Sequence, residues 1–191
     1  MKLIALTSFL FIIFATFMLL SENKYKEPPF ILLKQKDNIE IRQYEEYVIA
    51  KTSISLEQIK PDNNMFRILA SYIFGRNEKN QNILMTAPVT TYKDNNLSHM
   101  LFYMLDSDEI EDLPKPSGQD ITFEKFNLSK CAVIRFSWFV NEKKINKYQN
   151  QLEKFIEDNG YTKESPYMVN RYDSPWKLPF MRRNEVFVKI K

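Results

Sequence analysis

The predicted elements occur in the same order in both halves of the chain, and this repeat constrains the fold more than any other feature of the sequence. Each half contains two segments of alternating apolar and polar residues, then a helix, then two more strand-like segments. Neither half alone can cover the apolar face of its own sheet, so we expect residues 30–191 to form one domain. The predicted fold class is α+β: a pseudo-twofold repeat of strand, strand, helix, strand, strand, forming a curved antiparallel sheet or distorted β-barrel with two helices.

Hydrophobic periodicity places these elements along the chain. The expected strands are 39–44, 47–52, 84–92, 100–105, 121–126, 131–136, 167–172 and 185–190. The first helix is expected to be capped by Asp62 or Asn63 and to end at Gly75. The second is expected to begin at Asn141 and to end at Gly160. A connection rich in proline, 113–118, separates the two halves.

An uncharged apolar segment, 3–20, precedes this domain. At about 1.5 Å per residue, a helix of this length spans roughly 27 Å, close to the hydrocarbon thickness of a bilayer. Residues 1–21 are therefore expected to be a signal peptide or an N-terminal membrane anchor. The length and the poor cleavage site after Ser21 favour a retained anchor without excluding cleavage. We expect residues 22–29 to be a linker, and the bulk of the chain to lie outside the cytoplasm, membrane-anchored or secreted.

Scarce residue types exclude many common functional sites. Cys131 is the only cysteine, which rules out an intramolecular disulfide and any multi-cysteine metal site. The only histidine is His99, so zinc sites built on two or three histidines are excluded. Three glycines cannot build a phosphate-binding loop. The net charge of +3 is spread along the chain without a basic run, so nucleic acid is not an expected partner.

Two motifs carry a resemblance to a known family. Segment 82–90 contains Met-Thr-Ala-Pro-Val, and segment 172–186 contains an aromatic and proline-rich loop followed by Arg-Arg-Asn-Glu-Val. Together, in this order and spacing, they resemble the SOUL/haem-binding-protein family, and the resemblance extends over essentially all of residues 30–191. It implies a β-rich barrel with two helices that binds haem or another tetrapyrrole in an apolar groove. It also implies that the chain is not an enzyme, because members share no catalytic apparatus.

The resemblance suggests that part of the first helix lines the groove, although most of its apolar face is expected to be core. The expected ligand-binding residues are Met65, Phe66, Leu69, Ile73, Arg67, Arg76, Met85 and Trp176. Arg67 and Arg76 flank the helix and are candidates for charge-assisted bonds to propionates; the alternative is a solvated flank. His99 is the only imidazole that could bind a metal, here haem iron. Its position at the start of a strand favours an exposed or hydrogen-bonded structural role.

A second cluster of charged residues lies in the C-terminal motif. Arg182, Arg183 and Glu185 are expected to form a structural ion-pair and hydrogen-bond lock between the proline-rich loop and the last strand. Trp176 and Phe180, each next to a proline, are expected to anchor this loop or to rim the groove.

Three classes of function remain open. The favoured one is a carrier or buffer of haem or a related flat apolar ligand. A hydrolase-like enzyme would use a groove carboxylate, and Glu40, Glu45 and Glu124 lie in or beside strand patterns; this class predicts a buried glutamate with a raised pKa. A cell-envelope interaction module predicts a groove closed by side chains and an exposed apolar patch elsewhere.

Overall fold

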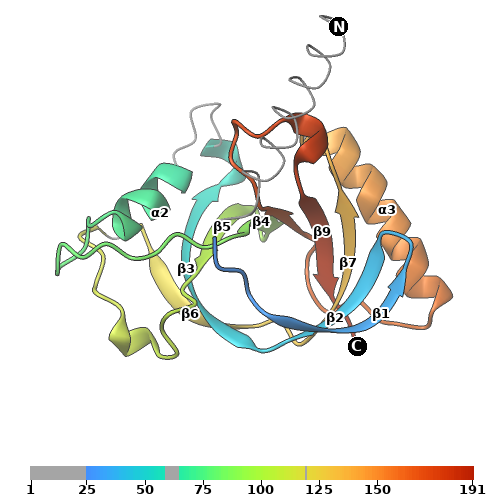
Figure 1. The fold of residues 1–191 in the computed structure, drawn as a ribbon, viewed down its shortest axis with the longest axis horizontal. Coiled ribbons are helices and arrows are strands. Elements are labelled where there is room, and N and C mark those ends of the chain that lie inside the picture. The colour runs from blue at the N-terminus through green and yellow to red at the C-terminus, as the bar shows by residue number, and fades with distance from the viewer. Residues whose placement is uncertain (1–24, 59–64, 119) are drawn as a thin grey trace, which may run out of the picture.

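The computed structural model describes residues 25–58, 65–118 and 120–191, and within them one sheet of nine strands curls into a half-barrel (Figure 1). The strands are β1 (Phe30–Lys36), β2 (Ile39–Tyr44), β3 (Glu46–Ser55), β4 (Val89–Asp94), β5 (Leu97–Tyr103), β6 (Thr122–Asn127), β7 (Lys130–Phe136), β8 (Met168–Arg171) and β9 (Asn184–Lys189). Their order is β1-β2-β7-β9-β8-β4-β5-β3-β6, and every pairing is antiparallel. The helices are α2 (Met65–Ile73) and α3 (Glu142–Asp158), with short 3₁₀ turns η1 (Leu56–Gln58), η2 (Ile110–Asp112) and η3 (Pro179–Met181). The predicted α+β class is confirmed.

The two helices lie outside the curled sheet, α2 against β3 and β5 and α3 against β7 and β9 (Figure 1). Because successive strand side chains point to opposite faces, each strand contributes to two cores. On β5, Leu101 and Tyr103 pack inside the curl, whereas Phe102 packs against α2 on the outer face. The molecule therefore has an inner core within the curl and two outer cores, one beneath each helix.

Both helices end as predicted. At the end of α2, the Gly75 N–H donates to the Tyr72 carbonyl and the Arg76 N–H to the Ser71 carbonyl, with Gly75 at a φ of 101°. This is a Schellman motif, and glycine supplies the left-handed conformation that it requires. Gly160 ends α3 in the same way at a φ of 71°. Asn141 caps the start of α3 by accepting a bond from the Lys144 N–H at 2.9 Å. The expected cap residues of α2, Asp62 and Asn63, lie outside the described residues.

One strand prediction is wrong, and one strand was not predicted. Segment 84–92 was expected to be one strand, but β4 begins only at Val89. The preceding residues include Pro88, which has no N–H to donate to a sheet ladder, and Thr86 instead donates its hydroxyl to the Tyr103 carbonyl. Strand β1 was not predicted, because its apolar residues are consecutive and all seven of its residues are exposed at the edge of the sheet.

The first described residues, 25–29, pack across the barrel. The Ala87 N–H donates to the Lys26 carbonyl at 2.9 Å, Tyr47 donates its hydroxyl to the Pro29 carbonyl at 2.5 Å, and Pro28 is buried. We call residues 25–29 the strap. Within the described part of the chain, no helix is both long enough and apolar enough to cross a bilayer, and the expected anchor at 3–20 lies outside that part.

Candidate functional site

The expected ligand-binding residues on α2 divide into a buried and an exposed set. Leu69 and Ile73 are fully buried between α2 and the sheet, and Met65 is also buried. Phe66 is 49 % exposed and packs its ring edge-on against Phe102, with the centroids 5.5 Å apart. The buried residues hold the helix on the sheet, and Phe66 is the part of this face that a ligand can reach.

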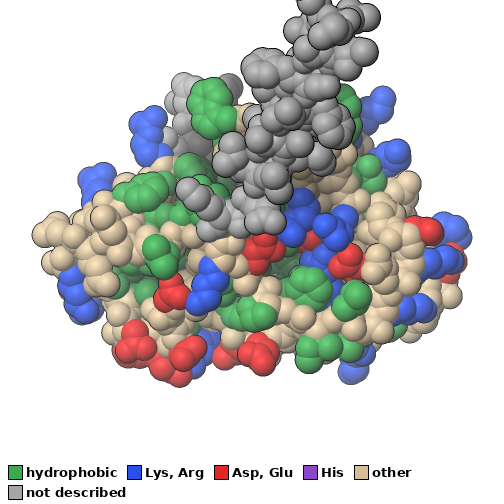
Figure 2. Space-filling view, viewed as in Figure 1, with side chains coloured by type: hydrophobic (Ala, Val, Ile, Leu, Met, Phe, Trp, Pro, Cys, Tyr) green, Lys and Arg blue, Asp and Glu red, His purple; other side chains and the backbone are tan. Residues whose placement is uncertain are grey.

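Further exposed apolar side chains lie beyond the end of α2. Phe74 and Leu84 are both largely exposed, and the adjacent Met85 is half-buried against the α2 core. Arg67 and Arg76 are exposed near the two ends of the helix. Figure 2 shows hydrophobic side chains gathered over the α2 side of the molecule. We call the exposed side chains of Phe66, Phe74, Leu84, Arg67 and Arg76 the α2 surface; three of them are apolar and two carry a positive charge.

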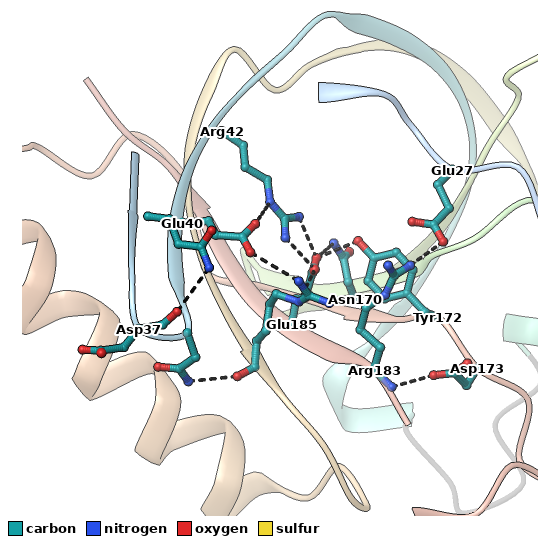
Figure 3. Close-up of polar contacts among 12 residues, drawn as sticks. Glu27, Asp37, Glu40, Arg42, Asn170, Tyr172, Asp173, Arg183 and Glu185 are labelled. Atoms are coloured by element: carbon teal, nitrogen blue, oxygen red, sulfur yellow. Dashed lines mark hydrogen bonds and ion pairs between the residues drawn. The ribbon is translucent and has the colours of Figure 1, made fainter. Parts of the chain in front are cut away.

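The inner face of the curled sheet holds a second cluster, which is polar and buried (Figure 3). Arg42 on β2 donates to both carboxylate oxygens of Glu185 on β9, at 2.8 and 3.1 Å, and to Glu40 at 2.6 Å. Glu185 also accepts bonds from the Tyr172 hydroxyl at 2.6 Å and from the Asn170 amide at 3.3 Å. We call these residues, with Tyr44, the inner polar cluster.

The pKa values in this cluster follow from ion pairing. Burial alone would raise the pKa of the Glu185 carboxyl, but the charge of Arg42 and the bonds from Arg42 and Tyr172 outweigh it, so this pKa is lowered. Burial alone would lower the pKa of the Arg42 guanidinium, but Glu185 raises it overall. Both groups therefore stay ionised. A hydrolase would need a buried glutamate with a raised pKa, and Glu185 has the opposite shift.

The other carboxylates considered for catalysis are also engaged or exposed. Glu40 is buried and pairs with Arg42 and, at 3.4 Å, with Arg135. Glu124 on β6 pairs with Lys51 on β3 at 2.6 Å. Glu45 is exposed. These contacts do not favour the carboxylate-based enzyme.

The cavity beside the inner polar cluster is too small for a tetrapyrrole. It measures about 10 Å³ and is lined by Pro28, Tyr44, Pro88, Tyr103, Asn170 and Tyr172, among others. A volume of roughly 10–15 Å³ holds one water molecule, whereas sites for drug-sized ligands need about 300 Å³ or more. This cavity is therefore too small to hold haem.

His99 lies on the opposite face of the sheet from α2. It is buried on the inner side of β5, where its Nδ1 lies 2.7 Å from the Ser53 hydroxyl and its ring stacks on Tyr92 at 4.5 Å. Burial and the nearby Lys51 lower its pKa. Within the described residues, no three His, Cys, Asp or Glu side chains gather as metal ligands. The structure does not bring His99 together with the α2 residues.

The C-terminal motif makes only part of the expected contacts between the proline-rich loop and the last strand, because two of its charged residues have ion-pair partners elsewhere. Arg182 donates to the carbonyls of Lys177 and Pro175 within the loop, and Arg183 pairs with Glu27 of the strap. The Glu185 carboxylate pairs with Arg42 on the inner face of the sheet. Sequence alternation did not reveal this pair, because it places Glu40 and Arg42 on one side of their strand but does not show which distant residue faces them. Trp176 is 92 % exposed, so it does not anchor the loop.

Sequence comparison identifies relatives of the chain. The sequence profile of a family described as SOUL heme-binding protein matches residues 25–189. Heme-binding protein 2 from Homo sapiens is 30 % identical over 164 residues, which cover 81 % of this chain and 78 % of the human protein. Heme-binding protein 2 from Mus musculus is 28 % identical over 162 residues, with the same coverage of both chains.

Solved structures of distant sequence share the fold. The C-terminal domain of EcmrR superposes with a TM-score of 0.58 at 14 % identity, covering 84 % of this chain and 99 % of that domain. A protein described as a hydrolase from Listeria innocua superposes with a TM-score of 0.55 at 9 % identity, covering 83 % of this chain and 94 % of the other. At these identities the similarity establishes the fold alone.

Proposed function

The chain belongs to the SOUL heme-binding protein family, and we propose that it binds haem or a related flat tetrapyrrole on the exposed surface of α2. The observation that carries this proposal is the contrast between the two faces of the sheet. The inner face is closed around a cavity of about 10 Å³. The α2 surface presents the exposed Phe66, Phe74 and Leu84.

Each part of a tetrapyrrole has a chemically suitable contact on this surface. The apolar macrocycle would lie against Phe66 and the neighbouring apolar side chains, because burying such surface is favourable. The propionates would bind Arg67 and Arg76, whose guanidinium groups form paired bonds with carboxylates. Met85, half-buried against the α2 core, is a further contact of the proposed site. The exposed Trp176 lies on the loop before η3 and is not included in it. A bound haem would supply an iron centre, but His99 faces away from α2, so we propose binding without imidazole from this chain.

We further propose that the protein acts as a non-enzymatic carrier or buffer outside the cytoplasm, anchored to a membrane or secreted. The lowered pKa of Glu185 supports a binding role over hydrolysis. The uncharged segment 3–20 supports the membrane location, either as a retained anchor or as a cleaved signal peptide.

A haemin titration of the full chain in mild detergent, followed by Soret absorbance, tests the binding site. We expect saturable binding that weakens about tenfold in Phe66→Ser, since removing the ring loses roughly 1–2 kcal/mol of apolar contact. His99→Ala should bind as the wild type does. The matched control is Phe180→Ser, because Phe180 has a similar exposure, 51 %, and lies outside the α2 surface.

Two results would contradict the proposal. If the wild type gives no saturable Soret change, tetrapyrrole binding is wrong. If Phe66→Ser and Phe180→Ser weaken binding equally, haemin adsorbs to exposed aromatic side chains in general and the α2 site is wrong.

A further inference from the structure

An exposed aromatic patch lies away from both the α2 surface and the inner polar cluster. We define it as Trp138, Phe139, Leu178 and Phe180, whose side chains are 39–54 % exposed. Two segments build it: the loop between β7 and α3, and residues 178–180 at the start of η3. They are joined by a bond from the Trp138 N–H to the Pro179 carbonyl at 2.8 Å. The patch is therefore a defined surface built from segments about 40 residues apart in the sequence.

The backbone at Trp138 shows that this exposure is imposed by the fold. Trp138 has a φ of 77°, in the left-handed region that a bulky side chain rarely adopts. Its N–H is bonded to Pro179 and its carbonyl accepts from the Asn184 amide at 3.0 Å, so both sides of the residue are fixed. Strained residues of this kind persist where the surrounding structure enforces them, often at functional surfaces. In this conformation the indole of Trp138 is half-exposed.

Basic side chains surround the aromatic patch. Lys144 lies 5.9 Å from the Trp138 ring, and the Arg182 guanidinium lies 4.8 Å from the Phe139 ring. Lys143 and Lys147 are exposed on the first turns of α3. The nearby acidic groups are already matched, because Glu142 pairs with Lys93 and Asp173 with Lys177. The surroundings of the patch are therefore positively charged.

Acidic residues gather on the opposite side of the molecule. Asp106, Asp108, Glu109, Glu111 and Asp112 lie in and before η2, at the lower left of Figure 1, whereas η3 lies at the top beside the start of α3. Two of these acids pair with lysines, Asp106 with Lys26 and Glu109 with Lys125. Figure 2 shows the red acidic side chains collected at that lower edge. A molecule with separated charge is oriented by a charged surface, with its basic end towards anions.

From these observations we infer that the aromatic patch docks onto the surface of an anionic phospholipid bilayer. Tryptophan side chains settle at the level of the lipid headgroups, and phenylalanine and leucine beside them enter the boundary between headgroups and acyl chains. Lysine and arginine nearby pair with headgroup phosphates. The start of the described chain supports this occupant. Glu27 of the strap pairs with Arg183, two residues beyond η3, so the chain that follows the apolar segment 3–20 joins the domain beside the patch loops.

The two tryptophans provide a native probe of this contact, since Trp138 and Trp176 are the only ones in the chain. In the full chain, Trp176→Phe leaves Trp138 as the sole indole. This variant is mixed with vesicles of phosphatidylcholine, with or without phosphatidylglycerol, whose acyl chains carry bromine. We expect the bromine to quench most of the Trp138 emission on the anionic vesicles and much less on the neutral ones.

Charge variants in the same background separate docking from simple tethering. Lys143→Glu with Lys147→Glu should remove most of the quenching on anionic vesicles. Lys36→Glu with Lys79→Glu changes the net charge equally at distant exposed positions and should leave the quenching unchanged. Emission that bromine does not quench on anionic vesicles would overturn the inference. So would quenching that is equal on both vesicle types, or a patch that is instead buried in a concentration-dependent dimer or by a protein partner.

Discussion

At the residue scale, the inner polar cluster is held together by Arg42. Its guanidinium compensates both Glu185 and Glu40 in a buried environment. Arg42→Met should therefore lower the free energy of unfolding by roughly 3–5 kcal/mol, because the buried carboxylates keep only the half-exposed Arg135 as an ion-pair partner, at 3.4 Å from Glu40 and 4.0 Å from Glu185. The measurement is urea denaturation followed by circular dichroism.

The reason for this loss can be checked with a second variant. Combining Arg42→Met with Glu185→Gln removes the buried negative charge of Glu185, so the double variant should be more stable than Arg42→Met alone. A double variant less stable than the single one would show that lost packing, and not the uncompensated carboxylate, dominates.

The lowered pKa of His99 leads to a prediction of how stability depends on pH. Burial and Lys51 lower its pKa in the folded protein below the ordinary value of about 6.5. As the pH falls through that ordinary value, the unfolded chain takes up a proton that the folded protein does not. The free energy of unfolding therefore decreases as the pH decreases. Between about pH 7.5 and pH 5.5, above the range where carboxylates titrate, the free energy of unfolding should decrease less in His99→Gln than in the wild type. An unchanged decrease would contradict a buried neutral imidazole.

At the element scale, α3 was predictable because its signals are local. Its apolar spacing, the Asn141 cap and the Gly160 terminus act within a few residues of one another. Strand β1 was not predictable, since an edge strand whose residues are all exposed has no buried face to create alternation. The late start of β4 was not predictable either. Pro88 has no N–H to donate to a neighbouring strand, and the sequence does not show which strand that is.

The cap of α3 gives a direct prediction. Asn141→Ala should lower the free energy of unfolding by about 1 kcal/mol, because the Lys144 N–H loses its acceptor. Asn150→Ala is the matched control: it makes the same change at an exposed position within α3, where alanine is the better helix former. Thermal unfolding should show Asn141→Ala below the wild type and Asn150→Ala at or above it. The reverse order would contradict the capping role.

At the scale of the whole molecule, the candidate site could be predicted only in part. The α2 face was identified from its spacing, but the sequence could not show that the curl of the sheet buries Leu69 and Ile73 beneath the helix and leaves Phe66 exposed. Nor could it show that His99 faces the other side of the sheet, because that depends on the pairing of β5 with β3 and β4. The pairing of Arg42 with Glu185 joins residues 143 positions apart in the sequence.

The strap gives a prediction that belongs to the entire fold. It crosses the half-barrel, buries Pro28 over the small inner cavity and pairs Glu27 with Arg183. A chain that lacks residues 1–29 should therefore lose about 2 kcal/mol of stability from apolar burial and hydrogen bonds, and its inner face should open to solvent. A chain that lacks only residues 1–24 keeps the strap and is the matched control. Hydrogen exchange should show faster exchange of the β2 and β5 amides only in the shorter chain. Equal exchange in both would mean that the inner core closes without the strap, and that Pro28 covers the cavity without stabilising it.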